Sequence, residues 1–293
     1  MTTFLLKNFN PPVPVTIPAH LQGLITEKDL KEWPHFLKWH QSLQASLQRQ
    51  HTDEKHPFKE APFSLIYVSV LSVKMFGTKI GFVKIDAIIT NKEDRFLPGT
   101  AFLRGNSVAM LMILRPRDSI DERWVIMTEQ PRIPAGTLSF MEIPAGMMDE
   151  RTREVYGVAV KEIKQETGLV VPPEELIDMT ELALKDVDNP EALANGMYPS
   201  PGGSDEFMHI VLWEKVLDRQ EIEDLRGNLA GERKGGELIT VRLRNYEDLW
   251  RVGARDAKTL AAWSLYESLK RSRNAEMLAM ERKSREEGRN RRK

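Results

Sequence analysis

Residues 146–169 read GMMDERTREVYGVAVKEIKQETGL, and this stretch constrains the fold more than any other part of the chain. A helix is predicted from about Thr152 to Gly168, because glycine can adopt the left-handed conformation that ends a helix. Glu162 and Glu166 are four residues apart and therefore share one face of that helix. Two like charges there repel each other, and a divalent cation bound by their oxygens would relieve the repulsion. The alternative is an ordinary amphipathic helix with both glutamates in solvent.

Segments on both sides of this stretch narrow the interpretation. Upstream lie TEQPR at 128–132 and MEIPAG at 141–146, and downstream lies YPSPGGSDE at 198–206. In this order they resemble the Nudix family, in particular its ADP-ribose and ADP-sugar diphosphatases, with the greatest similarity to the eukaryotic ADP-sugar diphosphatases. The resemblance extends from roughly residue 30 to residue 270 and includes RDAK at 255–258.

The chain departs from the usual Nudix signature at several positions. Lys161 stands where the family has arginine, and Gln165 replaces a glutamate. One extra residue separates Gly146 from Lys161, so that Glu154 is the acid nearest to the position of the early glutamate. A glutamine offers an oxygen but no charge, and we therefore expect fewer or weaker secondary metal sites.

The resemblance implies an α/β protein, a Nudix α/β/α sandwich with a small N-terminal β-rich domain. We expect an N-terminal arm and helix at 1–55, a β-rich domain at 56–100 and the Nudix domain at 101–269. The basic segment 270–293 is expected to be a disordered tail, with a nuclear-localisation or nucleic-acid-binding patch as the alternative.

Local patterns predict the elements of this fold. Residues 1–20 should be an extended arm, and residues 185–201 should form a long loop. Hydrophobic spacing predicts helices at 27–50 and 218–225 and a final helix capped by Asp256. Segments rich in β-branched and aromatic residues predict strands at 63–75, 79–90, 107–114, 124–128, 178–184, 207–213 and 239–243, with a turn at Gly77.

By resemblance, one magnesium ion is held by the Ala145 carbonyl, Glu162 and Glu166, with Gln165 as a weaker ligand and manganese as a substitute. Gly146 lacks a Cβ and would allow the backbone to approach the metal closely. In the ADP-ribose branch a loop glutamate acts as the catalytic base, which implies that role for Glu206. Its loop contains Gly202 and Gly203 and is expected to move over the substrate. A polar hairpin turn is the alternative for this loop.

Substrate contacts are expected from Arg132, Arg104, Glu142 and Asp205, and Asp205 is also the second candidate for the base. Arginine binds phosphate through two parallel hydrogen bonds, which suits Arg132 and Arg104 to a diphosphate. Arg104 has an ordinary surface arginine as its alternative, and Glu142 could order metal-bound water or contact the nucleoside. The six histidines show no metal-ligand spacing and are expected to be structural.

Composition excludes several classes of protein. The 293 residues contain no cysteine, which rules out disulfides and thiolate zinc sites. The net charge of −1 gives no general attraction to nucleic acid or anionic membranes, so neither is expected as a partner. No stretch of eighteen apolar residues is present, and no targeting segment is recognised, which predicts a cytoplasmic or nuclear protein.

These features predict magnesium-dependent hydrolysis of the diphosphate of ADP-sugars, ADP-ribose or ADP-glucose, to AMP and a sugar 1-phosphate. The alternatives are a diphosphatase of other nucleotide sugars such as UDP-glucose and a non-catalytic nucleotide-sugar-binding protein. A homodimer through residues 60–100 is expected, because the apolar strands Leu65–Val73 and Ile80–Ile89 have little chain to cover them.

Overall fold

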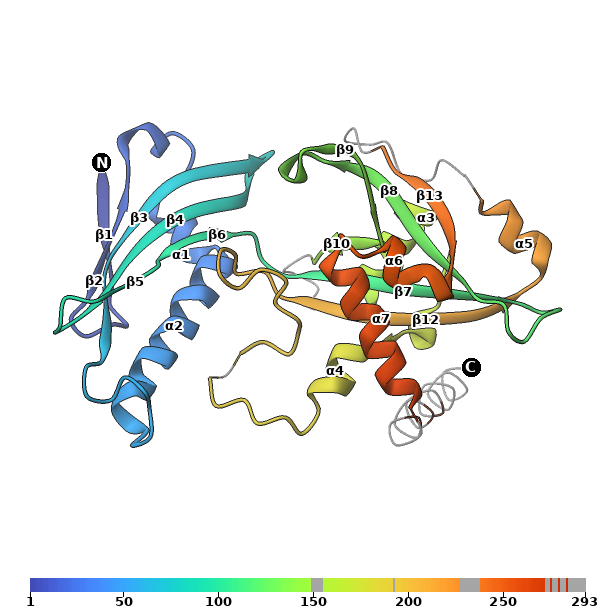
Figure 1. Ribbon diagram of the computed structural model, residues 1–293. Coiled ribbons are helices and arrows are strands. Elements are labelled where there is room, and N and C mark those ends of the chain that lie inside the picture. Colours follow the sequence, from blue (N-terminus) through green and yellow to red (C-terminus); the bar gives the residue numbers. More distant parts are fainter. Residues whose placement is uncertain are drawn as a thin grey trace. The chain divides into compact units, whose positions relative to one another are not determined.

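The computed structural model describes residues 1–148, 155–191, 193–226 and 238–271, together with Ala275, Ala279 and Lys283. The described chain divides into two compact units. Unit 1 contains Met1–Asn106, Asp188–Ala194 and Ser200–Glu206, and unit 2 contains Ser107–Val187, Asn195–Pro199 and Phe207–Lys293. Figure 1 labels the helices and strands of both units. The boundary between the two domains was expected after residue 100. The first segment of unit 1 ends slightly later, at Asn106.

Unit 1 is built on a sheet that, within the described residues, has six strands in the order β1-β2-β3-β4-β5, with β6 paired to β4. Strands β2 and β3 are parallel, and the other neighbours are antiparallel. The strands are β1 (Thr2–Leu6), β2 (Val13–Ile17), β3 (Phe63–Phe76), β4 (Lys79–Asn91), β5 (Phe96–Leu97) and β6 (Thr100–Leu103). The helical elements are η1 (Ala19–Leu21), α1 (Glu27–Glu32) and α2 (Pro34–Thr52).

The long hairpin of β3 and β4 forms as predicted, with Gly77 at a φ of 61° in its turn. The prediction of an extended arm at 1–20 is wrong, because this segment forms β1 and β2. Alternate residues of these strands, such as Phe4 and Val15, are buried in the core of unit 1. The expected helix 27–50 is divided at Trp33, since Pro34 begins a new helix there.

Unit 2 contains a mixed sheet that, among its described residues, has seven strands in the order β11-β12-β7-β8-β13. Strand β10 also pairs with β7, and β9 pairs with β8. Strands β12 and β7 are parallel, whereas the other pairs are antiparallel. The strands are β7 (Ser107–Pro116), β8 (Trp124–Arg132), β9 (Thr137–Glu142), β10 (Ala145–Met147), β11 (Ile177–Asp178), β12 (Met208–Leu217) and β13 (Thr240–Asn245).

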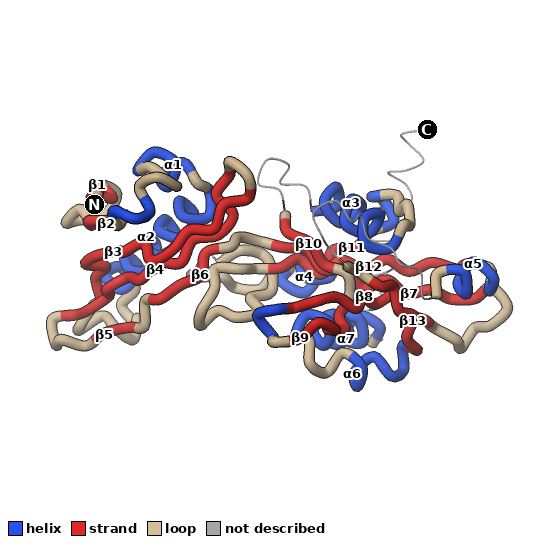
Figure 2. The backbone as a smooth tube through the Cα atoms, turned by 90° about the horizontal axis from the view of Figure 1, so that it is seen from above, coloured by secondary structure: helices blue, strands red, loops and turns tan. Residues whose placement is uncertain are grey.

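Helices cover both faces of the sheet in unit 2, as Figure 2 shows for α3 and α7. Alternate residues of the buried strand β7 enter two apolar clusters, Val108 on the side of α3 and Ala109 on the side of α7. The helical elements are η2 (Ile133–Ala135), α3 (Val155–Thr167), η3 (Pro173–Glu175), α4 (Met179–Leu184), α5 (Arg219–Asp224), η4 (Tyr246–Asp248), α6 (Leu249–Val252) and α7 (Ala257–Lys270). The predicted α/β sandwich with a β-rich N-terminal part is confirmed.

One expectation for the middle of the chain fails. Residues 178–184 were expected to form a strand, but only Ile177–Asp178 is extended and α4 follows. The reason is the Asp178 side chain, which accepts hydrogen bonds from the backbone N–H groups of Thr180 and Glu181 and so starts a helix. The expected loop 185–201 is confirmed for its described residues, since no helix or strand is assigned there between α4 and β12. Residues 188–194 of this loop belong to unit 1.

None of the helices in the described residues is long and apolar enough to span a membrane.

Candidate active site

Helix α3 presents two glutamates to the turn that leads into β10 and includes its first residues, Ala145 and Gly146. The helix ends before Gly168, whose φ of 76° agrees with the predicted left-handed end. Ile163 is fully buried in the cluster on this side of the sheet and fixes the rotation of the helix. Glu162 and Glu166 lie on either side of it in the sequence and flank the turn at Ala145 and Gly146.

Backbone pairing holds that turn to the central strand of unit 2. Ala145 and Gly146 pair with Ala109 and Val108 of β7, and the Met110 N–H donates to the Pro144 carbonyl at 2.9 Å. The Ala145 N–H donates to a Glu166 carboxylate oxygen at 3.2 Å. The turn and the helix are therefore linked directly through a metal-ligand candidate.

Gly146 has no room for a side chain. A Cβ at this position would collide with Cγ and Cδ of Glu162 and would lie 2.6 Å from its Oε2 atom. The glycine predicted to permit close approach to a metal thus permits close approach of the Glu162 carboxylate. The structure brings Ala145, Glu162 and Glu166 together, and their binding of a metal stays a prediction.

The electrostatics of Glu166 favour a cation at this position. The residue is 5% exposed. Burial, and then the carboxylates of Glu162 and Glu142, raise the pKa of Glu166 to about 8 against the opposing effects of Arg132 and the Ala145 N–H. Carboxylates crowded in this way are stabilised by an added positive charge.

The donor set fits a hard divalent ion, since carboxylate and carbonyl oxygens are the ligands that magnesium prefers. In the described part of the chain, no three carboxylate or imidazole side chains lie close enough together to bind one metal ion. The Glu162 and Glu166 carboxylates and the Ala145 carbonyl would therefore be the core of the ligand set. Gln165 is half-buried on the same helix, and its ligation also stays a prediction. Lys161 is exposed, and its suggested partner Glu154 lies outside the described residues.

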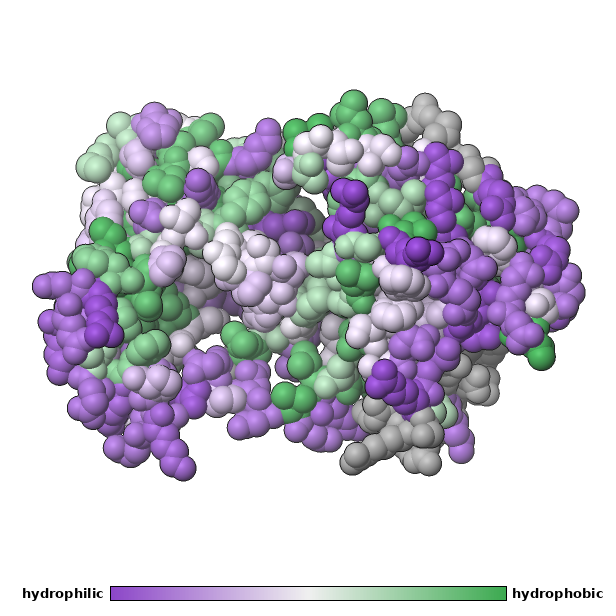
Figure 3. Space-filling view, in the orientation of Figure 1, coloured by the Kyte–Doolittle hydropathy of each residue, from purple (hydrophilic) through white to green (hydrophobic). Residues whose placement is uncertain are grey.

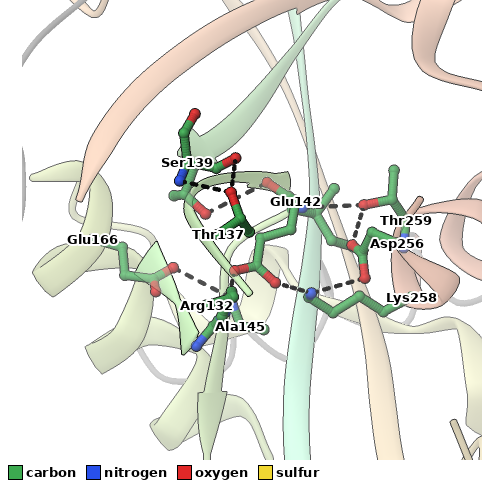
Figure 4. A network of polar contacts seen from close by, with 11 residues as sticks. Arg132, Thr137, Ser139, Glu142, Ala145, Glu166, Asp256, Lys258 and Thr259 are labelled. Carbon is green, nitrogen blue, oxygen red and sulfur yellow. Dashed lines mark hydrogen bonds and ion pairs between the residues drawn. The ribbon is translucent and has the colours of Figure 1, made fainter. Parts of the chain in front are cut away.

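Glu142 is the centre of a polar network beside this turn (Figure 4). Its carboxylate is almost completely buried, and Oε1 accepts from Arg132 Nε at 2.6 Å. The other oxygen accepts from Lys258 Nζ, which also donates to Asp256 Oδ1 at 2.9 Å. Asp256 caps α7 as predicted, through the Thr259 N–H. Arg132 is partly exposed, with 40% of its side chain accessible.

A second group of predicted residues lies in unit 1. Arg104 Nη1 forms an ion pair with Glu206 Oε2 at 3.1 Å, and Glu206 is 8% exposed. Asp205 Oδ1 accepts from the backbone N–H of Arg104 at 2.7 Å and from that of Gly105 at 3.2 Å. This contact gives Asp205 an anchoring role, and its predicted contact with substrate stays a prediction.

The loop that contains Glu206 is tied to strand β6. The Phe102 N–H donates to the Gly203 carbonyl at 2.8 Å, and Phe102 forms a parallel bridge with Ser204. These bonds restrict the loop more than its two glycines suggested. Arg104 Nε is buried and has no hydrogen-bond partner among the described residues, so a polar donor remains available beside Glu206.

The structure thus places the predicted residues in two groups. Unit 2 holds Ala145, Glu142, Arg132, Gln165 and the two glutamates predicted to bind the metal, and unit 1 holds Arg104, Asp205 and Glu206.

Lys258 and Thr259, which contact Glu142 and the Ile143 N–H, were not predicted to lie beside the candidate site. The RDAK segment at 255–258 could have indicated Lys258. A lysine in the first turn of a helix is disfavoured by the positive end of the helix dipole, so its presence there indicates a stabilising contact elsewhere in the fold.

Sequence reasoning also missed a paired histidine. His209 Nδ1 lies 2.7 Å from Asp178 Oδ2. Burial raises the pKa of Asp178, but hydrogen bonds from His209, Thr180 and the Glu181 N–H outweigh this, and the pKa lies below its ordinary value. A structural role was expected for all histidines, and this contact anchors β12 to the start of α4.

The sequence of this fold and site matches a known domain. Residues 103–264, more than half of the 293, match the NUDIX domain. The chain belongs to the NUDIX family. This NUDIX chain is 38% identical over 213 residues to Nudix hydrolase 14, chloroplastic, of Arabidopsis thaliana. The aligned region covers 72% of the chain and 65% of that relative.

A solved structure described as an ADP compounds hydrolase is also similar to this NUDIX chain. It aligns with a TM-score of 0.46 and 15% identity, covering 71% of this chain and 94% of the other. The name of the Arabidopsis relative places that protein in the chloroplast, and a cytoplasmic or nuclear location for this NUDIX chain stays a prediction.

Gly146→Ala is expected to weaken magnesium binding and hydrolysis together, because the new Cβ would displace the Glu162 carboxylate. A loss of ~10–100-fold in metal affinity is expected from a misplaced ligand. Isothermal titration with magnesium measures it. Gly136→Ala is no suitable control because its φ is 69°, whereas Gly23→Ala adds a methyl group in open space at an ordinary backbone angle. Unchanged magnesium affinity in Gly146→Ala would contradict the ligand role of Glu162.

Proposed function

We propose that this protein hydrolyses the diphosphate of ADP-sugars in a magnesium-dependent reaction, giving AMP and ribose 5-phosphate from ADP-ribose or AMP and glucose 1-phosphate from ADP-glucose. The observation that supports it most is the buried carboxylate of Glu166, raised in pKa by Glu162 and Glu142 at the Ala145–Gly146 turn. Membership of the NUDIX family and similarity to a relative named as a hydrolase support the same reaction class.

Ala145, Glu162 and Glu166 would hold magnesium, or manganese in its place, with Gln165 as a weaker ligand. The bound ion would neutralise charge on the diphosphate oxygens. Arg132 uses Nε for Glu142, and its remaining N–H groups are suited to a phosphate oxygen. Glu142 would thus act on the substrate through Arg132.

Glu206 is proposed as the general base, which takes a proton from the attacking water on a carboxylate oxygen. Arg104 contacts Glu206 directly and would hold this carboxylate in one orientation. The Nε atom of Arg104 and the Asp205 carboxylate are proposed to contact substrate. The anchoring bonds of Asp205 would in addition keep the neighbouring Glu206 in place.

Two other functions are kept as alternatives. The same reaction could act on UDP-glucose or another nucleotide sugar. Gln165 replaces a charged glutamate of the family signature, and Lys161 replaces an arginine, whose planar guanidinium group can make two parallel hydrogen bonds. These two departures favour a non-catalytic nucleotide-sugar-binding protein as the second alternative.

A panel of nucleotide sugars separates these functions. The protein is incubated with ADP-ribose, ADP-glucose or UDP-glucose and magnesium, and a phosphatase then releases phosphate only from cleaved, monoesterified products. We expect release from the ADP-sugars and none after chelation of the metal. Phosphate release from UDP-glucose alone would assign UDP-glucose as the substrate in place of the ADP-sugars. Binding of a nucleotide sugar without phosphate release would support the non-catalytic alternative.

We also propose a homodimer through unit 1. Apolar side chains reach the surface of its strands, where Figure 3 shows hydrophobic patches. Ile66 and Ile88 are 47% and 40% exposed, and Phe96 is 67% exposed. Patches of this kind are typical of protein interfaces.

Sedimentation at micromolar concentration is expected to give a species of twice the 33.6 kDa chain mass. Ile66→Glu should shift it towards the monomer, because a charge at an apolar interface must be desolvated. Val216→Glu, at an equally exposed position in unit 2, is the matched control. An active wild-type monomer would contradict the proposal.

A further inference from the structure

Lys258 occupies a position that local helix stability does not explain. It is the second residue of α7, where the positive end of the helix dipole disfavours a cation. Its side chain is only 10% exposed, and a buried ammonium group is costly unless it is paired. The reason for a lysine here must therefore lie in its tertiary contacts.

Those contacts reach the strand that leads to the candidate metal turn. Lys258 Nζ donates to Glu142 Oε2 and to Asp256 Oδ1. The next residue, Thr259, accepts from the buried Ile143 N–H at 3.1 Å and donates from its hydroxyl to Asp256 Oδ2 at 2.5 Å. The first turn of α7 thus holds two consecutive residues of the segment ahead of Ala145. Figure 4 shows Lys258 and Thr259 beside Glu142.

Glu142 transmits this contact to Arg132. Its two carboxylate oxygens are divided between Lys258 and Arg132, so that the position of one cation depends on the other. The negative charge of Glu142 lies three residues ahead of Ala145, one of the metal-ligand candidates. Lys258 opposes that charge from the side of α7.

We propose that Lys258 is a positioning residue for the proposed reaction: it fixes Glu142 and thereby directs Arg132 towards a diphosphate. The proposal rests on the proposed function for the identity of the anion. Without Lys258, the Glu142 carboxylate would be free to turn and to draw the Arg132 guanidinium away from substrate. The RDAK segment then has a role at the site as well as at the start of α7.

Binding of inorganic diphosphate in the presence of magnesium, measured by calorimetry, tests the proposal without requiring turnover. Lys258→Met should weaken this binding by ~10-fold, within the range seen when the partner of a binding residue is removed. Lys258→Arg should restore most of it, because arginine keeps the charge. Lys270→Met, at the opposite end of the same helix and paired with Glu267 at the surface, is the matched control.

A double-mutant cycle distinguishes positioning from simple support of the fold. Once Glu142→Gln has removed the charge that Lys258 holds, adding Lys258→Met should weaken diphosphate binding little further. Removing both charges together also keeps the test open if Lys258→Met alone does not fold. Additive losses in the cycle would overturn the proposal, as would a lower melting temperature with unchanged diphosphate affinity.

The same titration separates this inference from the proposed function. A wild-type protein that binds diphosphate but cleaves no nucleotide sugar would refute hydrolysis, and the effect of Lys258→Met on binding would still decide the role of Lys258. A wild-type protein that binds no diphosphate would overturn both.

With ADP-ribose as substrate, Lys258→Met is expected to raise KM more than it lowers kcat, because Arg132 binds the diphosphate before and during the reaction.

Discussion

Glu166→Gln is expected to lower kcat/KM for ADP-sugars by about 10³-fold, the scale of a lost electrostatic group at a reacting centre. The substitution keeps the shape of the side chain and an oxygen that can accept from the Ala145 N–H. It removes the charge that burial and two neighbouring carboxylates already disfavour. The metal-free variant should therefore be as stable as the wild type, while its affinity for magnesium falls.

Thermal unfolding with and without magnesium checks this expectation together with steady-state kinetics. A ligand that binds only the folded state raises its stability by about 2.7 kcal/mol at one hundred times its Kd. The wild type should show such a rise in melting temperature, and Glu166→Gln should lose it. Glu181→Gln, at an exposed glutamate of α4, is the control. Wild-type rates in Glu166→Gln would remove the metal role of this residue.

Glu206→Gln is expected to lower kcat by about 10²–10⁴-fold, the range for loss of a general base. The amide can still accept from Arg104, so the local structure and the KM should change little. The loss should be confined to kcat because a base acts in the transition state. Single-turnover measurements at saturating ADP-ribose, together with calorimetric binding of the substrate, separate the two quantities.

Comparison with Asp205→Asn identifies the base. Asp205 is already engaged by the backbone of Arg104 and Gly105, so its loss should mainly disturb the loop. A larger fall in kcat for Asp205→Asn than for Glu206→Gln would assign the base to Asp205. A rise in KM alone for Glu206→Gln would make Glu206 a binding residue.

The predictions that succeeded depend on residues close together in sequence. The helix end at Gly168, the hairpin turn at Gly77 and the cap at Asp256 each follow from local backbone chemistry. The shared face of Glu162 and Glu166 follows from the helical repeat. Local patterns therefore gave the helix of the site and its carboxylate pair.

The predictions that failed depend on contacts between distant segments. Strand β2 pairs antiparallel with β1 and parallel with Val68 and Ser69 of β3, which lies more than fifty residues further along the chain. Lys258 and Glu142 are 116 residues apart, and only the fold brings them into contact. The expected strand 178–184 is an exception with a local cause, because the Asp178 side chain caps α4 through the N–H groups of Thr180 and Glu181.

The interleaving of the two units limits how this protein can be divided. Residues 188–194 and 200–206 belong to unit 1, whereas 195–199 and the chain from Phe207 onward belong to unit 2. A fragment that ends at Asn106 would lack Glu191, which accepts from Ser46 and Arg49 of α2. Recombination at a single junction between Asn106 and Ser200 would therefore transfer Arg104 without Glu206, so that a working exchange between relatives must carry both segments at once.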